Sequence, residues 1–159
     1  MLDIRIMNAP LTEVEIILAM AALRARESAL PYAGEVTPQE AYVLFSECGA
    51  KIIDVRSRFE FDYIGRVPGS VLIPWRFSIG GEMNANFLTE LHAQCSTSDT
   101  VLFLCRSGVR SHSAAMVAAA AGFTQAFNVV EGFEGDPDQY GQRGNTGGWR
   151  KARLPWIQD

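Results

Sequence analysis

The chain has 159 residues, of which 48% are hydrophobic and 20% are charged, as in an ordinary globular protein. This length accommodates one domain with a short extension and excludes a two-domain enzyme. The net charge of -4 provides no general attraction for nucleic acid or for an anionic membrane. We therefore expect neither as a partner, and we expect any anionic ligand to be bound by a local site.

The spacing of the cysteines indicates whether a metal is bound, and the length of the apolar stretches indicates whether the chain is secreted or spans a membrane. The three cysteines lie far apart, at Cys48, Cys95 and Cys105. Without a Cys-x-x-Cys pair or a Cys/His spacing typical of zinc, we expect no metal, no other cofactor and reduced thiols. The longest apolar stretch near the start, residues 16–23, is far shorter than the roughly 20 residues that span a bilayer. Two glutamates precede it where a signal peptide would be basic, so we expect a cytoplasmic protein.

Residues 1–33 are predicted to form an N-terminal helical extension, and residues 34–159 the main domain. A capping box, Thr12-Glu13-Val14-Glu15, begins a helix that is expected to run to about Ser28 and to end before Pro31. The apolar residues of this helix share one face. We expect that face to pack on the domain or on a second subunit.

A second capping box, Thr37-Pro38-Gln39-Glu40, predicts a helix from Pro38 to about Cys48 that stops at Gly49. Farther along, the patterns predict strands at 51–55, 70–74, 100–104 and 126–130, a broken helical stretch at 59–64, and helices at 85–95 and 111–121. This alternation favours an α/β fold with a mostly parallel central sheet and helices on both faces. In such folds, ligands bind beyond the carboxyl ends of the strands.

The strand at 100–104 leads directly into Cys105-Arg106-Ser107-Gly108-Val109-Arg110 and then into a helix. A tight turn at this place aims backbone N–H groups inward, and the start of the helix adds a partial positive charge. Gly108 permits the turn because glycine can take a positive φ, and Ser111 or Ser113 is expected to cap the helix. With two arginines nearby, we expect the cysteine to be a reactive thiolate.

These motifs resemble those of the rhodanese (thiosulfate sulfurtransferase) family over roughly residues 35–156. The loop from Cys105 to Ser111 is similar to the active-site loop of that family. The family's upstream signature and closing segment are matched by Ile53-Asp54-Val55-Arg56, Glu60, Gly65–Ser70, Val130–Gly132, Gly147–Trp149 and Leu154–Pro155. Arg66 departs from the pattern, because many relatives carry histidine there, and no role is carried over to it.

The resemblance implies a rhodanese-like fold and a sulfurtransferase. Cys105 would attack the outer sulfur of a small anionic donor such as thiosulfate and become a persulfide. The sulfur would then pass to cyanide, to a thiol or to a sulfur-relay protein. Arg106 and Arg110 are expected to neutralise the sulfonate-like end of the donor, and residues 107–109 to complete the loop.

The remaining polar residues and cysteines near these motifs are expected to be structural. Asp54 should cap the next turn or brace the loop through an arginine, with Arg56 and Ser111 as further supporting residues. His112 is expected to be at least half-exposed, since sulfur transfer requires no catalytic histidine. Cys48 and Cys95 are expected to be half-buried helix residues, with a role as a resolving thiol as the alternative for either one.

Two other functions fit parts of the pattern. Phosphatases and arsenate reductases that share the rhodanese fold use Cys-x5-Arg, whereas Arg110 follows Cys105 after four intervening residues, which predicts a smaller cradle suited to one sulfur atom. A non-catalytic binding module would typically lack the cysteine. The Gly-rich segment 132–148 is expected to be a surface loop, from which Arg143 could draw anions toward the site.

Overall fold

The computed structural model describes residues 9–159, so the first eight residues of the predicted extension lie outside the described residues. Its centre is a five-stranded sheet in the order β1-β5-β4-β2-β3, and every neighbouring pair of strands is parallel. The strands are β1 (Gly34–Val36), β2 (Lys51–Asp54), β3 (Val71–Leu72), β4 (Thr100–Leu104) and β5 (Gln125–Val129). The predicted parallel α/β fold is confirmed.

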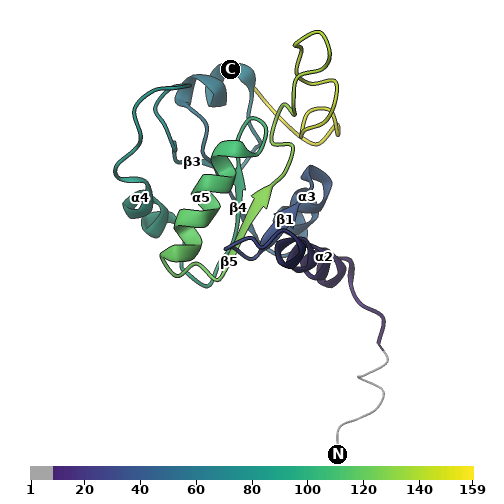
Figure 1. The fold of residues 1–159 in the computed structure, drawn as a ribbon. Helices are drawn as coiled ribbons and strands as arrows, with labels where there is room; N and C mark the ends of the chain where they lie inside the picture. Colours follow the sequence, from purple (N-terminus) through teal and green to yellow (C-terminus); the bar gives the residue numbers. More distant parts are fainter. Residues whose placement is uncertain (1–8) are drawn as a thin grey trace, which may run out of the picture.

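Helices cover both faces of the sheet, as predicted (Figure 1). They are α2 (Glu13–Glu27), α3 (Pro38–Glu47), α4 (Phe87–Gln94) and α5 (Val109–Ala120), with a short π-helical turn, η1 (Glu60–Ile64). Helices α2 and α3 share a core with one face of the sheet, whereas α4 and α5 share a core with the other. Both predicted capping boxes are present, at Thr12 and at Thr37.

The central strand β4 explains the long apolar run in the sequence. Val101 and Phe103 belong to the core beneath α4 and α5, while Leu102 and Leu104 belong to the core beneath α2 and α3. All four side chains are fully buried. A strand covered on both faces needs no polar alternation, and this strand carries Cys105 at its carboxyl end.

Several predicted boundaries were wrong for identifiable reasons. Strand β1 was missed because its three residues carry no pattern of their own; it forms by pairing with β5. Strand β3 is shorter than predicted and spans only Val71 and Leu72. Helix α5 begins at Val109, two residues early, because Gly108 with a φ of 105° already occupies the N-cap position.

Within residues 9–159, no helix is long and apolar enough to cross a membrane.

Candidate active site

Cys105 lies at the carboxyl end of the central strand, where the fold places ligands. Its side chain is 1% exposed. The backbone N–H of Gly108 donates a hydrogen bond to Cys105 Sγ over 3.1 Å. Because Gly108 is also the N-cap residue of α5, the sulfur lies beside the positive end of that helix. The predicted turn of the loop is therefore present, with Gly108 in the left-handed conformation.

Ser111 contacts the sulfur instead of capping α5. No side chain caps this helix, so the predicted roles of Ser111 and Ser113 as caps were wrong. Ser111 Oγ lies 3.2 Å from Cys105 Sγ and donates to Asn128 Oδ1 at 2.6 Å. Asn128 Nδ2 in turn donates to the carbonyl of Gly108 at 3.2 Å. This buried chain ties the sulfur and the loop to β5, a connection that the sequence did not indicate.

The start of the Gly-rich segment is joined to the Cys105 loop by two backbone hydrogen bonds. The N–H of Phe133 donates to the carbonyl of Cys105 at 2.8 Å, and the N–H of Glu134 donates to that of Arg106 at 2.9 Å. Gly132 has a φ of 63°, and a Cβ there would overlap both of these carbonyl groups. The predicted surface loop is thus wrong for this end of the segment, because Gly132 and Phe133 are buried.

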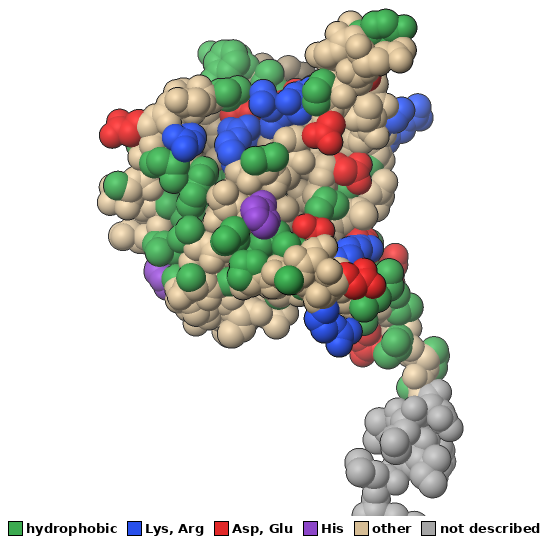
Figure 2. All heavy atoms as spheres, in the orientation of Figure 1, with side chains coloured by type: hydrophobic (Ala, Val, Ile, Leu, Met, Phe, Trp, Pro, Cys, Tyr) green, Lys and Arg blue, Asp and Glu red, His purple; other side chains and the backbone are tan. Residues whose placement is uncertain are grey.

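A cavity of about 430 Å³ opens above Cys105. Four arginines line it, Arg76, Arg106, Arg110 and Arg143, together with the acidic residue Asp136. Figure 2 shows basic side chains gathered on this part of the surface, beyond the start of α5. Arg143 therefore lies at the cavity as predicted, whereas Arg76 was not singled out from the sequence. The cavity is suited to a small anion.

The positive charge of Arg110 is neutralised by a buried carboxylate of the same protein. Its two terminal nitrogens donate to the two carboxylate oxygens of Glu60, each over 2.8 Å. Glu60 is 2% exposed and also accepts hydrogen bonds from the N–H and hydroxyl of Ser57. Burial alone would raise the pKa of Glu60, but the hydrogen bonds from Arg110 and Ser57 outweigh it and lower that pKa to about 2. Arg110 is therefore held by a carboxylate on η1 before any donor arrives.

The other three arginines leave positive charge for a ligand. Arg76 donates one hydrogen bond to the carbonyl of Gly81, and Arg143 donates one to that of Gly135. A carbonyl dipole does not cancel a full charge. Arg106 Nε is buried and meets no hydrogen-bond partner among the described residues. These three guanidinium groups come from three separate segments and meet at the cavity.

Asp54 and Arg56 form a fully buried pair, with 2.7 Å between Asp54 Oδ2 and Arg56 Nη2. Asp54 Oδ1 also accepts the backbone N–H of Arg56, as expected for a residue that caps a turn. The guanidinium donates to the carbonyl of Gly65 and lies 4.4 Å from the ring centre of Phe133. The predicted bracing of the loop is therefore indirect, since it passes through Phe133.

The remaining candidates lie away from the sulfur. His112 Nδ1 is 2.6 Å from the hydroxyl of Tyr32, and the ring does not line the cavity. Cys48 is exposed and Cys95 is buried, so the expectation of two half-buried side chains was wrong for both. They follow α3 and α4, outside the cavity. Burial raises the pKa of Cys95, which disfavours its reactive thiolate.

The fold and the loop together define an α/β protein with a buried cysteine in a tight turn at the start of a helix, beneath a cavity lined by arginines. Residues 37–136 match the family model of the rhodanese-like domain. The chain belongs to this family, as the motifs indicated.

Relatives include both named enzymes and proteins without an assigned activity. The chain is 41% identical to the protein in the crystal structure of Rv0390 from M. tuberculosis, over 80% of this chain and 99% of that one, with a TM-score of 0.72. It is 32% identical over 111 residues to thiosulfate sulfurtransferase 16, chloroplastic, of Arabidopsis thaliana, covering 69% of this chain and 89% of that protein. It is 31% identical over 111 residues to the uncharacterized protein RP600 of Rickettsia prowazekii, covering 67% and 82%.

Proposed function

We propose that the protein is a sulfurtransferase that carries sulfur as a persulfide on Cys105. The observation that carries this proposal is the position of Cys105 at the base of a cavity lined by arginines, with the N–H of Gly108 directed at its sulfur. A relative named thiosulfate sulfurtransferase supports the same chemistry.

The reaction consists of two displacements on sulfur. In the first, the Cys105 thiolate attacks the outer sulfur of thiosulfate, a new S–S bond forms, and sulfite leaves with the electron pair of the old S–S bond. In the second, a nucleophile such as cyanide or a thiolate attacks the outer sulfur of the persulfide and Cys105 leaves as a thiolate. The Gly108 N–H and the positive end of α5 stabilise the anionic sulfur in both steps.

The structure changes which arginines would hold the donor. Arg110 is already paired with Glu60. The sulfonate-like end of the donor would therefore be bound by Arg106, Arg76 and Arg143. Each of these retains N–H groups that can bind oxygen atoms of an anion. In this arrangement Arg110 is a positioning residue, which fastens the end of the loop to η1.

The test is a comparison of Cys105→Ser with Cys48→Ser, a matched change at an exposed cysteine outside the cavity. Cys105→Ser should abolish thiosulfate:cyanide transfer and should not gain the mass of one sulfur atom after incubation with thiosulfate. Cys48→Ser should retain the activity and gain that mass. Transfer by Cys105→Ser, or an added sulfur found on Cys95, would overturn the proposal.

A further inference from the structure

The cavity above Cys105 carries exposed apolar side chains at its mouth as well as arginines. Ile79 and Val109 both line it, and they are 60% and 73% exposed. A small anion bound to the guanidinium groups would leave both side chains in water. The mouth of the cavity therefore offers an apolar contact that the sulfonate-like end of a small donor does not use.

One wall of the mouth is a short hairpin, residues 76–83, whose ends are joined. Arg76 and Met83 form an antiparallel bridge at its base. Besides Ile79, this hairpin exposes Phe77 by 56% and Met83 by 39%. Arginine, methionine and aromatic side chains are the types that are enriched where one protein contacts another. The composition of the hairpin therefore favours a polypeptide as the ligand of the mouth.

The charge of the mouth is positive, although the chain as a whole carries a net charge of -4. The three guanidinium groups without a carboxylate partner among residues 9–159 face the single lining carboxylate of Asp136. Of the other carboxylates close by in the sequence, Glu82 and Asp138 do not line the cavity, and Glu134 is paired with Arg150 at 3.5 Å. A complementary ligand is therefore acidic, and its attraction to the mouth should weaken as salt is added.

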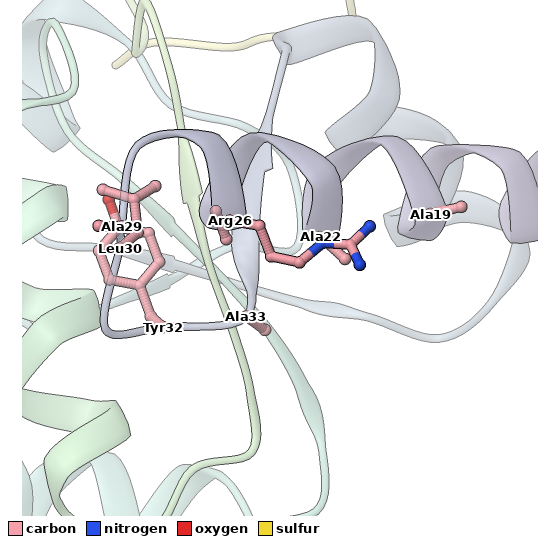
Figure 3. Close-up of a pocket in the computed structure, with 8 residues that line it drawn as sticks. Ala19, Ala22, Arg26, Ala29, Leu30, Tyr32 and Ala33 are labelled. Carbon is pink, nitrogen blue, oxygen red and sulfur yellow. The ribbon is translucent and has the colours of Figure 1, made fainter.

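The cavity is also larger than a thiosulfate or cyanide ion requires. Its volume of about 430 Å³ lies in the range of roughly 300–1,000 Å³ that is typical of sites for larger organic ligands. The groove of about 570 Å³ beside α2 is lined mostly by alanines, and Figure 3 shows the side chain of Arg26 lying along that helix. No cysteine lines that groove. Of these two hollows, only the one above Cys105 combines room for a larger ligand with a nucleophile.

We propose that the acceptor of the Cys105 sulfur is another polypeptide, in which a cysteine is flanked by apolar and acidic residues. This inference rests on the proposed function, because it assigns the partner of the second displacement. The carboxylates of the acceptor bind Arg76 and Arg143. Its apolar side chains cover Ile79 and Val109, so that its cysteine enters the cavity.

The transfer to this acceptor needs no further reactant. The acceptor thiolate attacks the outer sulfur of the Cys105 persulfide, and a new S–S bond forms on the acceptor. The old S–S bond breaks, and Cys105 leaves as a thiolate with its electron pair. The acceptor is then a persulfide, and Cys105 is ready for the next donor.

Peptide binding tests the surface without any sulfur transfer. The probe is a fluorescent peptide with a central serine in place of cysteine, a leucine on either side and glutamates at both ends. In the reference peptide, lysines replace the glutamates. The full chain should bind the acidic peptide at least tenfold more tightly at low salt, as measured by anisotropy, and the difference should shrink as salt screens the charges. Equal binding of the two peptides overturns the proposal.

The substitution Ile79→Ser tests the apolar part of the mouth. It should weaken binding of the acidic peptide about fivefold or more, because it removes a side chain that the peptide covers. Ile16→Ser is the matched control, since Ile16 is 48% exposed but lies on α2, outside the cavity. It should leave the affinity unchanged. An Ile79→Ser variant that keeps its circular dichroism spectrum and the full affinity overturns the proposal.

Sulfur transfer to the corresponding cysteine peptides connects this surface to the reaction. After Cys105 is loaded from thiosulfate, the acidic peptide should gain the mass of one sulfur atom at least tenfold faster than the lysine peptide at equal thiolate concentration. Ile79→Ser should slow this transfer at least fivefold more than it slows transfer to cyanide. Selective binding without any loading of Cys105 overturns the proposed function, whereas loading with no preference between the two peptides overturns only the docking surface.

Discussion

The pair formed by Glu60 and Arg110 should contribute substantially to stability in a pH-dependent way. The pKa of Glu60 falls from an ordinary 4.5 to about 2 in the folded protein. At about 1.4 kcal/mol per pH unit, the ionised carboxylate stabilises the folded state by about 3 kcal/mol at neutral pH. Because Glu60 is almost fully buried, solvent does not screen this contribution as it would for a surface pair.

The substitution Glu60→Gln tests this value. Glutamine keeps a side chain of similar shape but leaves the Arg110 cation without its carboxylate, so the free energy of unfolding at pH 7 should fall by about 3 kcal/mol. A depressed carboxylate pKa stabilises the protein above the unfolded value and loses this effect as the pH falls toward the folded value. The difference between wild type and Glu60→Gln should therefore shrink to about half by pH 3 and vanish near pH 2.

Denaturant unfolding followed by circular dichroism between pH 3 and pH 7 measures both quantities. Glu47→Gln, which changes an exposed carboxylate on α3, is the control and should have little effect. A double variant with Arg110→Gln should lose less stability than the sum of the two single variants, since neither charge is then left unpaired. A difference below 1 kcal/mol at pH 7, or one that does not change with pH, would refute the role assigned to this pair.

Three further substitutions, each with a control, test how the cavity is built. Arg143→Gln and Arg76→Gln should each raise the KM for thiosulfate several-fold, because each removes a cation from the cavity. The reaction of the preformed persulfide with cyanide should keep its rate. Arg58→Gln, at an exposed arginine outside the cavity, should change neither quantity. Gly132→Ala should destabilise the protein by about 2 kcal/mol or more and reduce sulfur transfer, because the added Cβ overlaps the carbonyl groups of the Cys105 loop. Gly141→Ala is the control: Gly141 has a similar positive φ but open space around it, so only the smaller backbone strain is expected.

The features predicted correctly from the sequence are those that depend on neighbouring residues. A capping box is complete within four residues, and both boxes formed as expected at Thr12 and Thr37. The buried run at 100–104 and Gly108 likewise determine the strand and the turn, although α5 begins two residues before its predicted start. Because the strand end, the turn and the cysteine are consecutive, the centre of the site could be located without any long-range contact.

The features that were missed depend on residues far apart in the chain. Glu60 and Arg110 are 50 positions apart, and neither sequence segment shows that the two side chains meet. Strand β1 has only three residues and exists because β5 lies beside it. Gly132 must approach two carbonyl groups of the loop, which cannot be deduced from a glycine in a Gly-rich segment. Ser111 was predicted to be a cap because a serine near a helix start commonly has that role. In the structure it is buried instead, and its hydroxyl lies beside the Cys105 sulfur.

These contacts separate the part of the site that positions the sulfur from the part that is proposed to bind the donor. The position of Cys105 depends on β4, on Gly108 and on the carbonyl contacts made by Phe133 and Glu134. Arg76, Arg106 and Arg143 have no carboxylate partner among residues 9–159, and two of these three, Arg76 and Arg143, come from segments outside the loop. Substitutions in those two segments can therefore change the charge and shape of the cavity while leaving the sulfur in place. Under the proposed function, a match to the loop alone therefore bears on the persulfide chemistry, whereas the choice of donor depends on residues that the loop motif does not contain.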